Sequence, residues 1–342
     1  MNILALLQHL NPVLAKTTIR QMSLIIYAML AMTGRVTMLG ISRWTDKGGS
    51  YRTVQRFFQT SIPWAQVFWS FFHAHLEQSE TVYVLAGDEC VATKSGKQTH
   101  GLDRFFSSLY GKPVPGIALF ALSLIDTEAR RSYPVMAEQV VRTEEEKAAA
   151  KEKRQQRQTR TKQGQAKRKP GRPKGSKNRN KADVCLTPEL LHIQEMIKQF
   201  LLLAGSALPL VYIVLDGHFG NNNALQMVLQ CGLHLVSKLR CDSALYFVYE
   251  GPDKRRKYGD KIDYANIPAK YLKETTTEDD IRTDIYQIAA RHKEFAQPLN
   301  VVIIVKTNLK TGSWAHVILF SSDLDLAWGK VIDYYRLRFQ IE

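Results

Sequence analysis

Two aspartates stand at the ends of strongly apolar segments, where an ionised carboxylate can bind a cation. Asp88 follows the apolar run at residues 82–86, and Asp216 directly follows a second run at 210–215. Runs of this length with β-branched residues predict buried strands. Taken alone, each aspartate is most simply a turn residue; taken as a ligand, it offers the oxygen atoms that Mg²⁺ prefers. Glu89 points to the other side of an extended chain and is the poorer ligand.

A third acid, Glu342, ends an amphipathic segment. Residues 323–342 predict one helix, with Asp323 as its expected N-cap. Tyr335, Arg338 and Glu342 stand at i, i+3 and i+7 of this helix. At about 100° per residue one stripe carries Trp328, Val331, Ile332, Tyr335, Phe339 and Glu342. A carboxylate at the edge of a core-facing stripe is costly unless cations hold it; the alternative is a solvent-facing glutamate on a frayed helix end.

The elements that must position these acids follow one another in a mixed α/β order. We expect strands at 82–86, 116–125 and 132–136, a helix at 188–203, a strand at 210–215, a helix at 222–231 and a strand at 233–238. The first three strands predict an antiparallel meander, and the alternation that follows predicts parallel pairing in the same sheet. A β-rich insertion at 239–321, with a basic face, is expected to contain strands at 245–249, 284–291, 299–306 and 315–321.

This order resembles the RNase H-like fold, a mixed five-stranded sheet with flanking helices. In that fold the first strand is central, lies beside the strand that carries the second acid, and is crossed by a late helix. The resemblance implies that Asp88, Asp216 and Glu342 converge. Three such carboxylates repel one another unless cations lie between them, so we expect two Mg²⁺ ions, for which Mn²⁺ can substitute. Two ions about 3.5–4 Å apart activate the attacking oxygen and stabilise the leaving one in phosphodiester cleavage.

The same residues resemble the DDE transposases of bacterial insertion sequences, in the group with a Tyr-x2-Arg-x3-Glu-x6-Lys signature. Tyr335, Arg338 and Glu342 fit its first three positions, and the contexts of Asp88 and Asp216 match those of the first two acids. The resemblance implies cleavage at transposon ends and strand transfer into target duplex DNA. It implies phosphate contacts from Tyr335 and Arg338, a homodimer on DNA, and a bacterial cytoplasmic protein associated with the nucleoid.

The sequence departs from this signature after Glu342, because the Lys expected seven positions later, after six intervening residues, is not in the chain. We therefore expect a truncated last helix, with Glu342 in a fraying turn where the helix dipole disfavours negative charge. The alternative function is a catalytically impaired, truncated transposase that acts as a DNA-binding regulator or inhibitor of transposition. A nuclease acting on RNA–DNA hybrids is a third hypothesis, which the basic insert favours less than duplex DNA.

The N-terminal region, residues 1–78, is expected to be a helical domain ahead of a catalytic domain at 79–342. Helices are predicted at 19–32, 51–59 and 63–77. Arg52 and Arg56 on the short second helix favour DNA binding, either through a helix-turn-helix or from a plain helical bundle.

A basic insert at 142–183 interrupts the catalytic domain. Between Arg142 and Lys181 there are 16 Lys and Arg against 4 Glu, a net charge of +12 within a chain of net charge +15. With so few large apolar residues, this segment is expected to be disordered in isolation. Its Gly-Arg-Pro centre resembles an AT-hook that enters the minor groove. A solvated linker that binds phosphates without sequence preference is the alternative. The candidate DNA-binding residues are Arg168, Lys169, Arg172 and Lys174.

The remaining composition excludes several classes of protein. The four cysteines form no Cys-x-x-Cys pair, which argues against a zinc ribbon or a disulfide framework and favours a reducing cytosol. The apolar segment 22–32 is too short to span a bilayer. Gly96-Lys97 lacks the rest of a phosphate-binding loop, so no small-molecule cofactor is expected.

Overall fold

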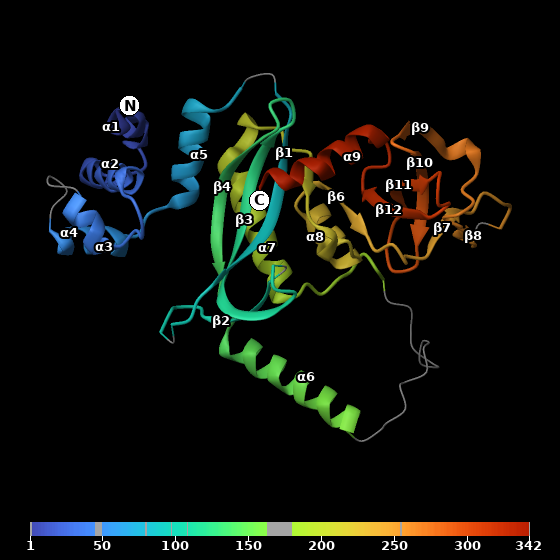
Figure 1. Cartoon of the computed structure of the whole chain (residues 1–342), viewed down its shortest axis with the longest axis horizontal. Helices are drawn as coiled ribbons and strands as arrows, with labels where there is room; N and C mark the ends of the chain where they lie inside the picture. The colour runs from blue at the N-terminus through green and yellow to red at the C-terminus, as the bar shows by residue number, and fades with distance from the viewer. Residues whose placement is uncertain are drawn as a thin grey trace.

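The computed structural model describes residues 2–44, 50–78, 81–96, 98–107, 109–162, 180–253 and 255–341. Along its longest axis lie a group of N-terminal helices, a central sheet covered by helices, and a β-rich part that continues this sheet (Figure 1). No helix in these ranges has both the length and the apolar character needed to cross a bilayer.

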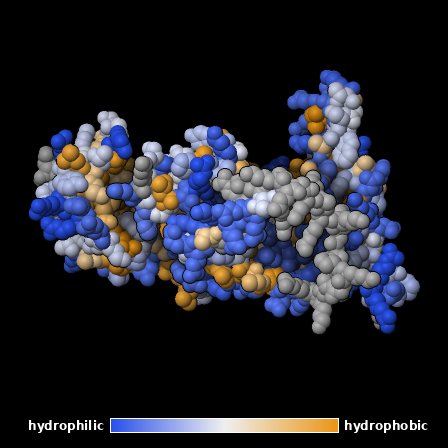
Figure 2. Space-filling view, turned by 90° about the horizontal axis from the view of Figure 1, so that it is seen from below, coloured by the Kyte–Doolittle hydropathy of each residue, from blue (hydrophilic) through white to orange (hydrophobic). Residues whose placement is uncertain are grey.

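The N-terminal part is a small helical bundle with its own apolar core. Its helices are α1 (Ile3–Leu7), α2 (Lys16–Ala31), α3 (Met38–Trp44), α4 (Tyr51–Gln59) and α5 (Trp64–His75). Ile19, Ile25, Ile41 and Val54 are buried in its centre. The three predicted helices are present, while α3 was not predicted because seven residues show no clear periodicity. Orange hydrophobic patches lie on this part and along the lower edge of the centre, between wide hydrophilic areas (Figure 2).

The central sheet begins with an antiparallel meander and continues with two parallel strands. Its strands are β1 (Tyr83–Thr93), β2 (Asp103–Ser107), β3 (Lys112–Asp126), β4 (Arg131–Val140), β5 (Tyr212–Val214) and β6 (His234–Leu239). β4 and β1 flank β3, and β5 and β6 follow β1 in parallel. This is the order expected for an RNase H-like sheet, with the first strand in the middle.

Helices cover both faces of this central sheet. The helices α7 (Pro188–Ala204) and α8 (Asn222–Gln230) pack on one face, against Leu85 and Ile213. The helix α9 (Trp328–Leu337) packs on the other face, against Ala86. In Figure 1, α9 (red) runs across the sheet towards β1. The two faces together therefore bury the first half of β1 (Tyr83–Gly87) and the last two residues of β5, as their continuous apolar runs require.

The β-rich insertion extends the same sheet instead of forming a separate one. Its strands are β7 (Leu245–Val248), β8 (Tyr258–Lys261), β9 (Leu272–Glu278), β10 (Ile281–His292), β11 (Leu299–Asn308) and β12 (Trp314–Ser321). β12 pairs with β6, so the described residues form one sheet of twelve strands where we expected five with an insertion. The four strands predicted here are present. β8 and β9 were not predicted because their residues are mostly polar and exposed.

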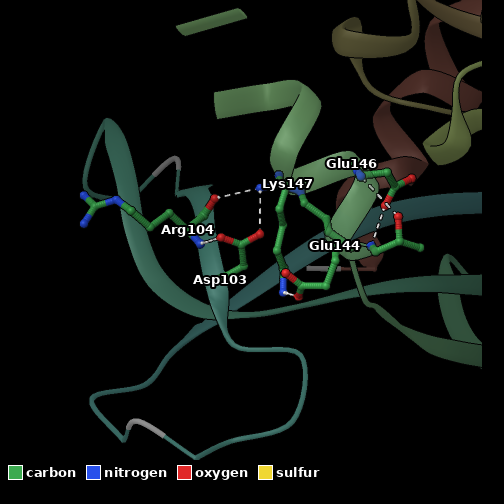
Figure 3. Close-up of polar contacts among 7 residues, drawn as sticks. Asp103, Arg104, Glu144, Glu146 and Lys147 are labelled. Atoms are coloured by element: carbon green, nitrogen blue, oxygen red, sulfur yellow. Dashed lines mark hydrogen bonds and ion pairs between the residues drawn. The ribbon is translucent and has the colours of Figure 1, made fainter. Parts of the chain in front are cut away.

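The first half of the basic insert forms a helix, α6 (Glu144–Lys162), so the expectation of disorder is wrong there. A capping box starts it: Glu146 Oε2 accepts from Thr143 N at 2.8 Å, and Thr143 Oγ1 accepts from Glu146 N at 3.2 Å. Arg142 fixes its base by donating to Asp103 Oδ2 (3.3 Å) and to the carbonyl of Arg104 (3.1 Å). Figure 3 shows Asp103 and Arg104 beside the first turn of this helix. The helix projects below the sheet (Figure 1).

The turn that leads into α9 is held by side chains from three other strands. Asn300 on β11 donates to the carbonyls of Asp323 (2.9 Å) and Leu326 (2.7 Å), and Gln287 on β10 donates to Leu326 at 2.9 Å. Tyr212 on β5 donates its hydroxyl to Asp323 Oδ2 at 2.6 Å. The prediction of Asp323 as the N-cap is therefore wrong, because its carboxylate binds Tyr212 and the helix begins five residues later. This network sets where α9 starts on the sheet.

Replacing Asn300 by Ala should lower the free energy of unfolding by about 2 kcal/mol, because the carbonyl of Asp323 loses its side-chain donor and the carbonyl of Leu326 keeps only Gln287. Urea unfolding measures the change. The exposed Asn266 offers the matched control, whose replacement by Ala should cost within about 0.5 kcal/mol. Equal losses for the two variants would show that the buried network does not hold the turn.

Candidate active site

Asp88 and Asp216 occupy the same level of two neighbouring parallel strands. Ala86 of β1 pairs with Val214 of β5, two residues before each aspartate. One residue further on, a Cβ added at Gly87 would lie 2.9 Å from the side chain of the residue that precedes Asp216. The two strands therefore stay in register up to the aspartates, which lie about one strand spacing, 4.8 Å, apart along the backbone.

Both aspartates belong to the face of the sheet that α9 covers. Side chains alternate along a strand, so Asp88 shares a face with Ala86, and Asp216 shares a face with Val214. Ala86 and Val214 pack with Val331 of α9. The carboxylates therefore come from two segments 128 residues apart in the sequence and meet on one side of the sheet.

Arg338, which follows α9, brings a cation to Asp88. Its side chain is buried, with 6% of the residue exposed, and Nη1 donates to Asp88 Oδ2 at 3.3 Å. The guanidinium also lies over the ring of Phe339, 4.5 Å from its centre. Tyr335 is half-buried on the same part of the chain. Glu342 lies outside the described residues, so its position relative to the aspartates stays a prediction.

The predicted stripe of α9 is wrong at its end. Val331 and Ile332 are buried as expected, but Phe339 is 52% exposed and Arg338 takes the buried position. The cause is a change from α-helix to 3₁₀ helix at Arg338–Gln340, which alters the angle per residue. Helical periodicity did not indicate that Arg338 is buried, and only the Tyr-x2-Arg-x3-Glu signature singled this residue out.

Asp216 is oriented by the turn that follows it. Its carboxylate Oδ1 accepts from the backbone N–H of His218 at 3.0 Å, as the cap of a 3₁₀ helix at Gly217–Phe219. Its carbonyl accepts from Ser237 Oγ of β6 at 2.7 Å. Backbone and side-chain contacts thus fix the direction of this carboxylate before any ligand binds.

A second polar cluster lies on the opposite side of the sheet, at the start of α7. His218 Nε2 lies 3.4 Å from Glu189 Oε1. This contact raises the pKa of His218 and lowers the pKa of Glu189. Burial raises the pKa of the neighbouring Glu89, and the negative charge of Glu189 raises it further. Glu89 is therefore directed away from Asp88, as predicted, and its surroundings favour the neutral acid. Sequence periodicity gave no sign of Glu189.

The N-terminal candidates Arg52 and Arg56 are exposed and lie one turn apart on α4. Arg56 borders a hollow of about 210 Å³ between α2 and α4, which is lined by Thr17, Thr18, Gln21, Thr53, Arg56, Phe57 and Thr60. Hydroxyl groups around a guanidinium suit a phosphate group. The threonines of α2 were not predicted, because their approach to α4 depends on the packing of the bundle.

The other DNA-binding candidates, Arg168, Lys169, Arg172 and Lys174, lie outside the described residues. For a metal ion, Asp88 and Asp216 supply two carboxylates. Within the described ranges no group of three or more His, Cys, Asp or Glu side chains could hold a metal ion. The third predicted ligand, Glu342, is not part of those ranges.

The sheet order, the helices on both faces and the paired aspartates define an α/β nuclease-like protein. The chain belongs to the DDE superfamily endonucleases, because the model of this family matches residues 5–297. The match includes Asp88 and Asp216 as well as the N-terminal bundle, and it ends before α9. A search of the curated proteins gave no match. Family membership supports a transposase-like nuclease function on DNA.

The glycines after Asp216 allow its turn to approach β6. A Cβ added at Gly220 would lie 2.1 Å from the carbonyl oxygen of Lys238, whereas one added at Gly329 of α9 would meet no atom within 4 Å. Gly220→Ala should therefore cost about 2 kcal/mol of unfolding free energy and displace Asp216. Gly329→Ala should stay within about 1 kcal/mol of wild type, on the stabilising side. Thermal unfolding compares them, and equal stability would contradict the close approach.

Proposed function

We propose that this protein is a DNA transposase that cuts at transposon ends and transfers the freed strands into target DNA. The single observation that supports it best is the pair Asp88 and Asp216. Asp88 lies within β1, and Asp216 lies at the same level just after the neighbouring parallel strand β5, on the face covered by α9. In this proposal Glu342 completes the acidic site. The family match supports the nuclease class, and the transposon-specific steps rest on the Tyr335, Arg338 and Glu342 signature.

The donor set fits divalent metal ions of the Mg²⁺ type. Both candidate ligands in the described residues are carboxylates, and hard cations such as Mg²⁺ and Mn²⁺ prefer oxygen. Such ions, when bound, activate the attacking oxygen and stabilise the leaving oxygen. The protein's own contribution is orientation: the N–H of His218 holds the Asp216 carboxylate, and Arg338 holds Asp88.

In this proposal Arg338 also binds the DNA strand. Its Nη1 lies 3.3 Å from Asp88, so a phosphate oxygen bound by the same guanidinium would lie next to the acidic site. Arginine binds phosphate through two parallel hydrogen bonds, which orients the group as well as attracting it. In this proposal Tyr335 contacts the same part of the strand.

The duplex around the cut would be held by the N-terminal bundle and by the basic insert. The support for the bundle is the exposed pair Arg52 and Arg56, of which Arg56 borders the hydroxyl-lined hollow. The support for the basic insert is the positive charge of residues 142–181 and the projection of α6 from the body of the protein (Figure 1). A homodimer on DNA and a nucleoid-associated protein stay predictions from the resemblance.

Replacing Asp216 by Asn should abolish Mg²⁺-dependent cleavage and leave DNA binding intact. Bound metal ions contribute several kcal/mol to such reactions, and each 1.4 kcal/mol is tenfold, so we expect a fall of about a thousandfold. Cleavage of a plasmid that carries the DNA flanking the coding sequence measures it. Asp88→Asn should behave alike, although it also leaves Arg338 without this ion-pair partner.

The matched control for these variants is Asp333→Asn on α9, whose carboxylate pairs with Arg130 on the surface. This variant should cleave as wild type does. Full activity in Asp216→Asn would refute the site. Tight DNA binding without cleavage by the wild-type chain would instead support the regulator hypothesis.

Replacing Arg52 and Arg56 by Gln should weaken duplex binding without changing the fold. Log affinity falls linearly with log salt concentration, and each lost phosphate contact should reduce the magnitude of this negative slope by about one. Fluorescence anisotropy across a salt series measures this slope. Lys310→Gln provides the control, because Lys310 is exposed and pairs with Asp280 at the far end of the sheet. An unchanged slope in the double variant would exclude α4 from the DNA interface.

A further inference from the structure

A lysine lies beside Asp216 on the side away from Asp88. Val214 of β5 pairs with Val236 of β6 in parallel, and the next backbone N–H of β5 donates to the carbonyl of Val236 at 3.1 Å. Two residues beyond this pair stand Asp216 and Lys238. Because residues at the same level of parallel neighbours share a face, Lys238 belongs to the face that carries both aspartates.

The turn after Asp216 directs the stem of Lys238. A Cβ added at Gly217 would lie 3.7 Å from Lys238 Cβ and 4.0 Å from Lys238 Cδ. The methylene groups of Lys238 thus run along the residue that follows Asp216. The close approach of Gly220 to the carbonyl of Lys238 fixes the backbone at the same place. The side chain is half-exposed, so its ammonium can reach solvent and ligand.

The charge of Lys238 is not used by the fold. Across the described ranges Lys238 forms no ion pair with a carboxylate, whereas Arg240, two residues later, pairs with Asp242 at 2.9 Å. A half-buried ammonium that lies near a carboxylate but forms no ion pair with it contributes little to the free energy of unfolding. An ammonium in this position suits an anion that binds next to Asp216.

We propose that Lys238 is a phosphate-binding residue of the active site, and this inference rests on the proposed function. Asp88, Asp216 and Lys238 form a row across three neighbouring strands, each about 4.8 Å from the next. The acids at one end hold the cations that act on the scissile phosphate. The ammonium at the other end binds a non-bridging oxygen of the same DNA strand as a point charge.

The alternative is that Lys238 only offsets the negative charge of Asp216. A lysine with that role contacts no phosphate, so its removal would change stability or metal affinity and leave the salt dependence of DNA binding unaltered. A phosphate contact has the opposite signature, because it releases counterions from the DNA. The slope of log affinity against log salt therefore separates the two roles.

The experiment uses the full chain, Ca²⁺ and a fluorescein-labelled duplex with a central nick. Lys238→Met keeps an unbranched apolar side chain and removes the charge. This variant should bind the duplex about tenfold more weakly, and the magnitude of its slope of log affinity against log salt should be smaller by about one. Lys238→Arg should restore the slope. Lys330→Met, an exposed lysine of α9, is the matched control and should behave as wild type. A wild-type slope in Lys238→Met would overturn the inference.

A second measurement does not depend on the stability of the variant. Single methylphosphonates near the nick remove one phosphate charge at a time. With wild-type protein, each contacted phosphate should reduce the magnitude of the slope by about one. At one of these positions Lys238→Met should lose nothing further. A further loss at every contacted position would overturn the inference. The slopes are measured without cleavage, so this test does not depend on catalytic activity. Cleavage that survives in Asp216→Asn would refute the proposed function, while the binding slopes would still decide the role of Lys238.

Discussion

The parallel pairing of β1 with β5 is the constraint on which the candidate site depends. It brings together two segments that are far apart in the sequence, and it is fixed by burial on both faces of the sheet. Leu85 packs towards α7 and α8, while Ala86 packs towards α9. Because side chains alternate with a period of two, a slip of one residue would turn the apolar residues and one aspartate to the wrong faces. The core therefore enforces the geometry of the acids.

The β-rich insertion is part of the support of this site. Its strand β12 pairs with β6, and Asn300 on β11 holds the turn from which α9 starts. Arg338, which contacts Asp88, comes at the end of α9. The position of this arginine is thus set by strands that come between β6 and α9 in the sequence. An insertion at this point of the fold can fix the last helix without supplying a residue to the acids.

Local sequence patterns predicted the elements well and their lateral contacts poorly. Apolar runs identified β1 and β5, and helical spacing identified α4 and α7. The expectation that the first strand ends at Asp88 is wrong, because pairing with β3 continues β1 to Thr93. Lys238 was not predicted, because its place beside Asp216 depends on the register of β6 against β5. The basic composition of residues 144–162 did not indicate the helix α6, whereas the capping box of Thr143 and Glu146 that starts it is readable in the sequence. Arg338 was found only through its spacing from Tyr335 and Glu342, since periodicity placed Phe339 in the core instead.

A site that cleaves a polyanion must collect negative charge for its metal ions and still admit a phosphate. In the proposed site these two requirements would be met by different elements of the fold. Asp88 and Asp216 concentrate the negative charge at the centre, and cationic side chains stand on either side, Arg338 against Asp88 and Lys238 beyond Asp216. Arg338 comes directly after the packed helix α9, and Lys238 lies on the strand β6, so the fold fixes the backbone of both residues. Arg338 does not need an ion pair with Asp216 to hold its position, nor does Lys238 need one with Asp88. A DNA strand laid along this row would meet a cation, the acids and a second cation in turn, which orients the strand as well as attracting it.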